Sequence, residues 1–421
     1  MPPTENSPLL DGHPYNDAPG GSRFKRFILA RGEPSWMASL KFLLLDSWMN
    51  LFLVFVPLSF VAQYLNWDAG LVFLFSFFAI IPLAKLLGEA TEQLSMKLGQ
   101  TLGGLLNASF GNAVEVIVGI AALAQGELRI VQTSMLGSIL SNLLLVLGMS
   151  FFAGGMVFQE SHFQQTAAQT SSSLMTLSCL TLVIPAAYHA AKAAGHEPFN
   201  PKSPSDVLDA LFKDPSPPAP GDAARDGLLL ISRGTAIILL LVYFSYLYFQ
   251  LKSHAILFQE ETPSEEEVPG MSMVAATVSL LTVTLITSFC ADFLVGSIEV
   301  TANKYHIPKA FIGVILLPLV SNAAEHVTSV WMSMKGKMEL TIGIAVGSSI
   351  QIAVFVIPTL ILVGWAIQEP LTLYFADFET IVLFVSVLLV NLLIQDGKSN
   401  YMEGMMLMSL YIIIALAFWV S

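Results

Sequence analysis

Two glutamates stand alone within apolar segments, and each follows an asparagine by three residues. They are Glu115, after Asn112, and Glu325, after Asn322. Residues three apart share one face of a helix, so each carboxylate and its amide are expected to lie together. An ionised carboxylate in hydrocarbon is costly, and such residues face a polar cavity and mark ion pathways. The residue types therefore indicate a buried cation site made of oxygen atoms.

Both Asn–Glu pairs belong to an internal repeat. The segments 103–138 and 313–348 match at a constant separation of 210 residues, with eight identical positions. The spans that follow each glutamate add hydroxyl and amide groups at matching positions: Ser138 and Ser141 in one copy, Ser348 and Gln351 in the other. We expect the two copies to meet and to gather these groups about one ion.

The expected ligands are carboxylate, amide, hydroxyl and freed backbone carbonyl oxygens. Ca²⁺ accepts about 6–8 oxygens in flexible geometry, Mg²⁺ resists dehydration, and Zn²⁺ prefers nitrogen or sulfur. Calcium is therefore favoured, with Mn²⁺ as a second substrate. Two close carboxylates titrate as a coupled pair, and burial favours their protonated forms once the metal has left. Metal and protons would compete for the same oxygens, which is a sufficient basis for exchange.

Glycines near these residues admit two interpretations. Gly111, Gly137 and Gly347 could loosen the helices and free backbone carbonyls, or they could allow close packing between helices. Both interpretations remain open at the level of sequence.

The composition places the chain in a membrane. Of 421 residues, 54% are apolar and only 12% charged, with a mean hydropathy of +0.69; soluble proteins carry about a quarter charged residues. The net charge of −12 argues against a nucleic-acid partner.

A bilayer crossing takes about 20 residues of helix. Eleven segments fit: 48–66, 70–88, 104–124, 130–157, 167–188, 228–250, 272–298, 310–333, 340–366, 377–395 and 403–420.

The predicted fold is an all-α polytopic membrane protein of eleven transmembrane helices, with one leading helix and two inverted five-helix repeats. Five spans separate the matching copies, so each copy should cross in the opposite sense to the other. This architecture is typical of secondary transporters. The predicted divisions are a disordered cytosolic tail (1–40), a leading helix (41–68), a first repeat (69–251, with a loop at 190–225), an acidic cytosolic loop (252–271) and a second repeat (272–421).

The charges of the tail indicate an orientation. Basic residues there place the N-terminus in the cytosol by the positive-inside rule: Arg23, Lys25, Arg26, Arg31 and Lys41. Glu5, Leu9 and Leu10 fit an acidic dileucine pattern that a sorting adaptor could read. The acidic loop is either a solvated segment or a regulatory segment that concentrates cations; its acids are Glu260, Glu261, Glu265, Glu266 and Glu267.

Other titratable residues near the site have weaker expectations. His326 follows Glu325 and is either a core histidine or part of a proton path. Asp292 is a candidate vestibule carboxylate, and Glu89 is expected at a solvated cavity mouth.

The strings Phe110-Gly111-Asn112-Ala113-Val114-Glu115 and Ser321-Asn322-Ala323-Ala324-Glu325-His326 resemble the paired signatures of the cation/proton exchanger (CAX) family. The likeness spans all eleven expected helices and is strongest to fungal vacuolar Ca²⁺/H⁺ exchangers. It implies a vacuolar membrane, a cytosolic N-terminus and Ca²⁺ uptake driven by proton efflux, with Glu115 and Glu325 as the shared carboxylates. Ser321 departs from the signature, which usually has glycine there.

Three alternatives remain for comparison. A Na⁺-coupled Ca²⁺ exchanger would need further acids on the central spans, and a Ca²⁺ channel would use an oligomeric ring of acids. An enzyme is not expected, because the sequence has neither a His-Glu-x-x-His nor a Gly-x-Ser-x-Gly motif. No cofactor is expected beyond the transported ions.

Overall fold

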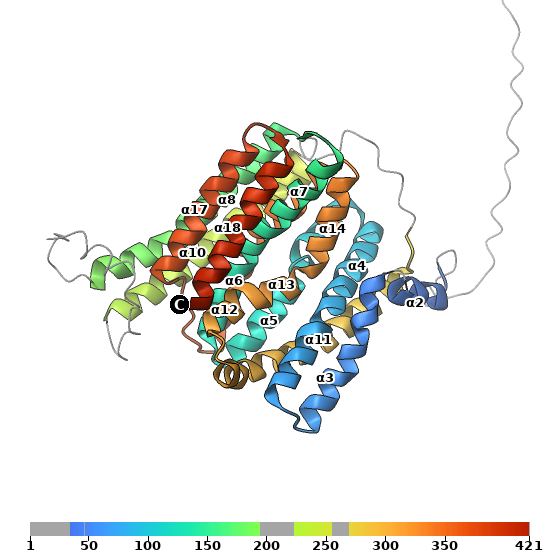
Figure 1. The fold of residues 1–421 in the computed structure, drawn as a ribbon, viewed down its shortest axis with the longest axis horizontal. Coiled ribbons are helices and arrows are strands. Elements are labelled where there is room, and N and C mark those ends of the chain that lie inside the picture. Colours follow the sequence, from blue (N-terminus) through green and yellow to red (C-terminus); the bar gives the residue numbers. More distant parts are fainter. Residues whose placement is uncertain (1–33, 46, 194–222, 255–268, 421) are drawn as a thin grey trace, which may run out of the picture.

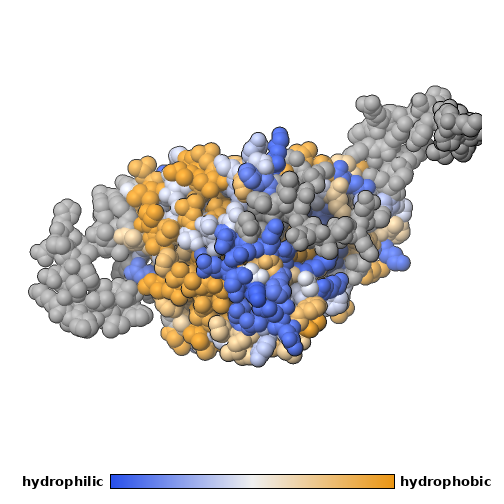
Figure 2. Space-filling view, turned by 90° about the horizontal axis from the view of Figure 1, so that it is seen from above, coloured by the Kyte–Doolittle hydropathy of each residue, from blue (hydrophilic) through white to orange (hydrophobic). Residues whose placement is uncertain are grey.

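The computed structural model is almost entirely helical and describes residues 34–45, 47–193, 223–254 and 269–420. Within these ranges, 8 helices are long and apolar enough to cross a membrane, and up to 10 if each of two bent pairs counts as one crossing. The helices form a bundle (Figure 1). Broad hydrophobic areas flank a hydrophilic patch on the face in Figure 2, as expected for a bundle whose sides lie in lipid.

The first half of the bundle begins with a short helix that lies across the next one. Its elements are α2 (Trp36–Leu45), η1 (Trp48–Val54), α3 (Phe55–Tyr64), α4 (Ala69–Phe110), α5 (Ala113–Ala124), α6 (Leu128–Leu140), η2 (Ser141–Val146), α7 (Leu147–Val157), β1 (Ser161–His162), α8 (Gln165–Ala193), α10 (Ala223–Tyr248) and η3 (Phe249–Ser253).

The second half repeats the pattern of long and broken helices. Its elements are α11 (Met273–Tyr305), α12 (Lys309–Phe311), η5 (Ile312–Leu316), α13 (Leu317–Ser321), α14 (Ala323–Met334), α15 (Met338–Gln351), η6 (Ile352–Val356), α16 (Ile357–Ala366), α17 (Asp377–Ile394), β2 (Lys398–Ser399) and α18 (Tyr401–Val420).

Helix α4 is continuous over 42 residues but is not straight. A Cβ atom built on Gly103 would lie 2.3 Å from the carbonyl oxygen of Ser95, although residues eight apart on a straight helix are separated by about 12 Å. The chain therefore reverses between these residues, and glycine is needed because any side chain would meet that carbonyl. The reversal separates the membrane-span candidate Ala69–Leu98 from the segment that leads to α5.

The two copies of the sequence repeat have matching local structure. Asn112 and Asn322 each interrupt a helix, and the helix resumes at the following alanine. Gly126 and Gly336 have positive φ angles of 74° and 77° in the turns after α5 and α14. The next helices contain the π-helical turns η2 and η6 at equivalent positions. The break at Asn322 forms even though Ser321 stands where a glycine was expected.

Contacts between helix termini distinguish the two ends of the bundle. We call the end where α10 finishes and α11 begins the loop end, because residues 255–268 join these helices. The start of α10 lies at the opposite, far end, where Leu373, just before α17, donates its N–H to Ser232 Oγ over 2.9 Å. Helix α17 therefore runs from the far end to the loop end.

The half-helices α5 and α14 point to opposite ends. After α5, Arg129 pairs with Glu379 at the start of α17, so α5 finishes at the far end. After α14, a Cβ atom built on Gly336 would lie 3.4 Å from the Phe158 ring, so the two residues are neighbours. Strand β1, just beyond Phe158, pairs in antiparallel fashion with β2, which follows the end of α17. Helix α14 therefore finishes at the loop end.

The Arg129–Glu379 ion pair joins the two halves at the far end. Two guanidinium nitrogens of Arg129 donate to the carboxylate oxygens of Glu379, at 3.0 and 2.5 Å. The Glu379 side chain is only 2% exposed, whereas that of Arg129 is 45% exposed. Glu379 Oε2 also accepts from the Ala376 N–H, so the pair fixes the entrance to α17.

We expect Arg129→Gln to lower the unfolding free energy by about 1–2 kcal/mol, because a buried carboxylate that loses its partner keeps its desolvation cost. Lys309→Gln is the matched control, since it removes the partner of the exposed Glu299 and should cost about 0–1 kcal/mol. Thermal unfolding of the purified protein in detergent measures both. Equal shifts would contradict a structural role for the Arg129 pair.

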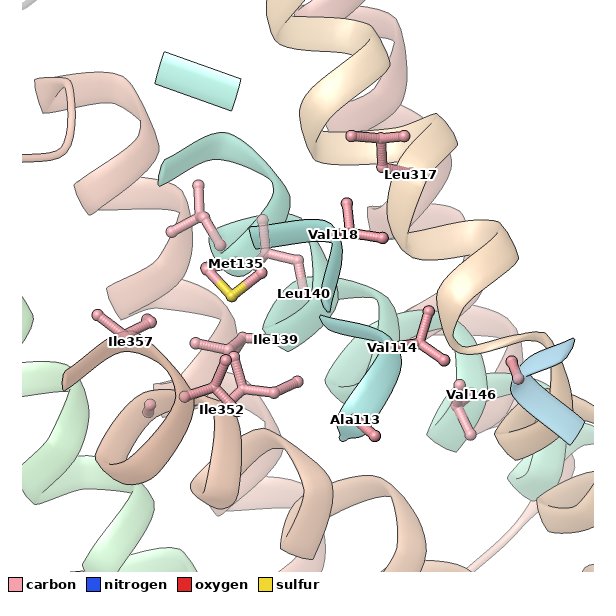
Figure 3. Packing of buried hydrophobic residues seen from close by; sticks show 14 of the residues in the cluster. Ala113, Val114, Val118, Met135, Ile139, Leu140, Val146, Leu317, Ile352 and Ile357 are labelled. Carbon is pink, nitrogen blue, oxygen red and sulfur yellow. The ribbon is translucent and has the colours of Figure 1, made fainter. Parts of the chain in front are cut away.

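Apolar side chains pack around the broken helices and hold them in place. Val118 of α5 lies near Met135 of α6, Ile139 of α6 lies near Ile352 of η6, and Val114 lies one turn from Val118 on α5 (Figure 3). All five are buried, at 5% exposure or less. The helix breaks that carry the polar residues are thus fixed by a close-packed apolar core, whose packing limits local movement.

Candidate cation site

Glu115 and Glu325 occupy equivalent positions, the third residue of α5 and of α14. The first turn of a helix has free backbone N–H groups and the positive end of the helix dipole, which lowers the cost of a carboxylate there. Both glutamates line one cavity of about 200 Å³. Two half-helices that approach from opposite ends of the bundle thus present their N-termini and carboxylates to a common space.

A chain of hydrogen bonds links the two halves beside these carboxylates. Asn322 Nδ2 donates to Asn142 Oδ1 over 3.1 Å, and Asn142 Nδ2 donates to Ser348 Oγ over 3.0 Å. Ser348 Oγ donates to Asn112 Oδ1 over 2.8 Å, and Asn112 Nδ2 donates to Gln351 Oε1 over 2.7 Å. Residues of both repeats alternate along this series of hydrogen bonds, which we call the asparagine chain. The asparagine chain therefore fixes the two helix breaks to each other.

Glu325 lies against this chain. Its carboxylate neighbours Ser348 and Asn142 and interacts electrostatically with Glu115. Among the described residues, its buried Oε2 atom has no hydrogen-bond partner. A buried oxygen without a partner is costly unless it binds a cation or a proton. Glu115, which is 4% exposed, has Ser321 as its side-chain neighbour.

The serines predicted beside the carboxylates have different surroundings. The backbone carbonyl of Ser138 accepts from Asn322 Nδ2 over 3.3 Å, and Ser138 lines a small void next to Glu115. The neighbour of Ser141 is the phenol of Tyr411 on α18, and no hydrogen bond joins its hydroxyl to the asparagine chain within the described residues. Of the eight predicted site residues, Ser141 alone has neither a bond to this chain nor a place in the two carboxylate-lined spaces described here.

Asn142 is a central member of the chain that the sequence analysis missed. Its position in the second repeat is held by Ile352, so a search for matching residues passes over it. A buried asparagine within an apolar span was nevertheless a visible signal, because polar side chains inside membrane helices face partners or cavities.

The other predicted titratable residues do not line the cavity that Glu115 and Glu325 share. His326 Nδ1 lies 2.7 Å from the carbonyl oxygen of Asn322, and the ring is buried. Asp292 is exposed on α11, where its carboxylate accepts from Gln125 Nε2 over 2.7 Å. Glu89 pairs with Lys85 over 2.6 Å, next to the cavity residue Gly88.

Several predicted residues lie outside the described ranges. They are the sorting residues Glu5, Leu9 and Leu10 and the loop acids Glu260, Glu261, Glu265, Glu266 and Glu267.

The cavity opens from the carboxylates toward the loop end. It continues past Thr328, which follows Glu325 on α14, and past Gly88 on α4. Further along α4, Gln93 accepts the N–H of Met271 at the start of α11. On the far side of Glu115, around Val118 and Pro318, lies a void of about 10 Å³, roughly enough for one water. Among the residues that the structure describes, the larger space beside the carboxylates therefore extends toward the loop end.

The glycines differ in role. A Cβ on Gly137 would lie 2.2 Å from the carbonyl oxygen of Val314, so α6 and η5 touch backbone to backbone there. A Cβ on the equivalent Gly347 would meet nothing within 4 Å. Close helix packing therefore explains Gly137, while it does not explain Gly347.

The donors suit a hard cation. Within the described residues, no three His, Cys, Asp or Glu side chains come together. The site consists of two carboxylates with amide and hydroxyl oxygens, which is an all-oxygen set of the type that Ca²⁺ prefers.

Comparisons with known proteins place this geometry among ion exchangers. Residues 69–252 and 275–420 match the family described as sodium/calcium exchanger protein. The vacuolar calcium ion transporter of Schizosaccharomyces pombe is 48% identical over 90% of this chain and 86% of its own length. Vacuolar cation/proton exchanger 3 of Oryza sativa is 40% identical over 95% and 92%. The crystal structure of the Ca²⁺/H⁺ antiporter protein YfkE has a TM-score of 0.70 at 32% identity and covers 88% of this chain and 98% of that protein.

Proposed function

The chain belongs to the sodium/calcium exchanger protein family, and on that premise we propose that it is an antiporter that moves Ca²⁺ from the cytosol into an acidic compartment in exchange for H⁺. Its relatives are named vacuolar calcium transporters, cation/proton exchangers and Ca²⁺/H⁺ antiporters. The resemblance to the cation/proton exchanger family is thereby confirmed.

One observation carries the proposal: each repeat contributes a carboxylate to one cavity, and neutral oxygen donors surround the pair. With Ca²⁺ between them, Glu115 and Glu325 are both ionised and their charge is balanced. Without Ca²⁺, two close carboxylates in a low-dielectric site repel each other and bind protons. The site switches its access from one side of the membrane to the other when it holds either Ca²⁺ or protons. It does not switch when both carboxylates are ionised and no cation is bound.

The asparagine chain holds the two helix breaks at the distance that both carboxylates need. Asn142 occupies its centre, between Asn322 and Ser348. Each asparagine amide in this series donates a hydrogen bond to the next member, so the amides position one another.

We expect Asn142→Leu to weaken Ca²⁺ transport by about tenfold, because it leaves Asn322 and Ser348 without their shared buried partner at about 1–3 kcal/mol. Initial rates of ⁴⁵Ca²⁺ uptake at several Ca²⁺ concentrations measure the change. Asn391→Leu is the control, since that amide bonds Thr176 between α8 and α17 instead. A wild-type rate curve for Asn142→Leu would remove the chain from the mechanism.

The arrangement of spans fits eleven crossings. The structure has ten candidates when each bent pair is counted once. The proposed eleventh crossing consists of α5 and the part of α4 beyond the reversal at Gly103. The opposite directions of α5 and α14 support an inverted repeat. The basic tail residues support a cytosolic loop end, and the extension of the cavity toward that end supports a state open to the cytosol.

Three further roles stay proposals. The names of the relatives support a vacuolar membrane, and Leu9 and Leu10 are proposed to direct the protein there through an adaptor. The acids of the 252–271 loop are proposed to concentrate Ca²⁺ near the cavity mouth. Mn²⁺, which accepts similar oxygen ligands, is proposed as a second substrate.

The experiment that tests the function is ⁴⁵Ca²⁺ uptake by purified protein in sealed proteoliposomes. We expect uptake when the lumen is acidic and Na⁺ is absent, and its loss when a protonophore dissipates the gradient under a clamped voltage. Uptake that follows a Na⁺ gradient and ignores the pH gradient would leave the site in place and overturn the coupling ion. Uptake that needs neither gradient would indicate a channel.

A further inference from the structure

A second space, apart from the cation cavity, lies on the side of the bundle beside α2. It is a groove of about 530 Å³ between α2, α3, α4 and α11. Most of its lining is apolar, with Leu40 and Leu44 of α2, Val56 of α3, Leu86 of α4, and Val278 and Ile286 of α11 as examples. Volumes of roughly 300–1,000 Å³ are typical of sites that hold small ligands.

Helix α2 forms one wall of this groove and lies across α3 at 91° (Figure 1). The segment Trp48–Tyr64 packs along α4, which contains the membrane-span candidate Ala69–Leu98. It therefore carries the crossing of this bent pair, and α2, perpendicular to it, lies along the membrane surface. Contacts with the start of α11 fix α2 at the loop end. The Ser272 N–H donates to Ser39 Oγ over 3.2 Å, and a Cβ on Gly270 would lie 2.8 Å from the Phe42 ring.

The exposed side of α2 has an apolar stripe and one basic residue beside it. Trp36, Met37, Leu40 and Leu44 line the groove and are 37–76% exposed, which suits contact with hydrocarbon and the interfacial region. Lys41 is also exposed but is not among the groove residues. An apolar stripe beside a cationic residue is the pattern of a helix that lies in the membrane interface.

The sequence just before α2 is basic, which favours an anionic headgroup near this helix. Within the twenty residues before Lys41, the sequence has four basic residues, Arg23, Lys25, Arg26 and Arg31, and one acidic residue, Glu33. Basic clusters next to a membrane-surface helix attract anionic lipids at about 1 kcal/mol for each residue.

We propose that the groove binds an acyl chain of an anionic phospholipid from the leaflet at the loop end, with its headgroup beside Lys41. The groove lies on the side of a bundle that lies in lipid, and Lys41 is exposed on α2 next to the groove residue Leu40. Bound lipid would fill the space between α2 and α11 and would affect the position of α11. Leu294 of α11 lines the void next to Glu115. The lipid therefore acts on a helix that packs against the cation site without contacting the site itself.

The test measures phospholipid retained by the full-length protein. Protein from nanodiscs of phosphatidylcholine with phosphatidylserine is transferred to detergent and examined by native mass spectrometry. We expect one phosphatidylserine to be retained in preference to phosphatidylcholine. Ser279→Trp, which fills the groove, should lower retention by roughly tenfold through lost apolar burial. Lys41→Gln should lower it by roughly fivefold.

Matched controls separate this site from general lipid association. Leu281→Trp adds the same ring to an exposed position of α11 outside the groove, and Lys335→Gln removes an exposed charge at the loop end; both should retain lipid like wild type. Retention that Ser279→Trp leaves unchanged would overturn the proposal. A protein dimer that Ser279→Trp abolishes would assign the groove to a second copy. Retention that appears only after deletion of residues 1–33 would assign it to the N-terminal segment.

Discussion

Glu115→Gln and Glu325→Gln are each expected to reduce Ca²⁺ uptake by at least about 100-fold. Removing one charge from a buried, charge-balanced set costs about 3–5 kcal/mol, and each 1.4 kcal/mol is a factor of ten. A glutamine also has no titratable group, so the proton half of the cycle is lost with the metal half. Initial rates of ⁴⁵Ca²⁺ uptake under an imposed pH gradient measure the effect.

The matched control is Glu299→Gln, which makes the same change at an exposed carboxylate of α11 that is paired with Lys309. It should keep most of the wild-type rate. Both site variants should express and remain folded, because glutamine has nearly the same shape as the glutamate that it replaces. Uptake at the wild-type rate in either site variant would remove that residue from the cation site.

Gly137→Ala is expected to destabilise the protein by about 2–3 kcal/mol, toward the upper part of the range for overpacking. The added Cβ would lie 2.2 Å from the carbonyl oxygen of Val314 and 2.7 Å from Pro318 Cγ. A backbone carbonyl cannot rotate away as a flexible side chain does, so α6 and η5 must separate. The separation moves Ser138, the next residue, which accepts a hydrogen bond from Asn322. Thermal unfolding in detergent and uptake should both decline.

Gly347→Ala is the internal control at the equivalent repeat position. No atom lies within 4 Å of its added Cβ, and alanine is favoured over glycine in a helix by up to about 1 kcal/mol. The two substitutions should therefore shift stability in opposite directions. Similar losses at both positions would contradict the close approach of α6 and η5.

The shared space of the two carboxylates could be predicted from the sequence because it follows from a repeated local pattern, whereas the glycines left helix breaks and close packing both open. Asn112 and Asn322 stand at the same place in two copies, and membrane carboxylates need a shared polar space. The repeated glycines Gly126 and Gly336 were a signal for matching turns that the sequence analysis did not use, since a positive φ angle favours glycine.

Features that join distant segments could not be predicted in this way. The ion pair between Arg129 and Glu379 connects residues 250 apart, and nothing in either local sequence names its partner. Asn142 has no counterpart in the second repeat, so symmetry hides it. The different roles of Gly137 and Gly347 depend on which neighbour approaches each helix, which repeat symmetry does not determine.

The course of α4 shows the same limit. Two spans were expected at 70–88 and 104–124. In the structure, α4 covers the first span and the start of the second, with a reversal near Gly103, and the second span is broken at Asn112. Hydropathy identifies apolar segments, but it does not report the contacts that bend a helix. The placement of α2 across α3 likewise depends on Ser39 and Phe42 meeting the start of α11.

The central claim is that Ca²⁺ and protons share Glu115 and Glu325. Calorimetric titration of the purified protein with Ca²⁺, at one mildly acidic pH in buffers that differ in ionisation enthalpy, tests it most directly. We expect the observed heat of binding to change in proportion to the ionisation enthalpy of the buffer, because Ca²⁺ displaces protons from the carboxylates. Binding with the same heat in every buffer would mean that no proton leaves when Ca²⁺ enters, and it would contradict a shared site.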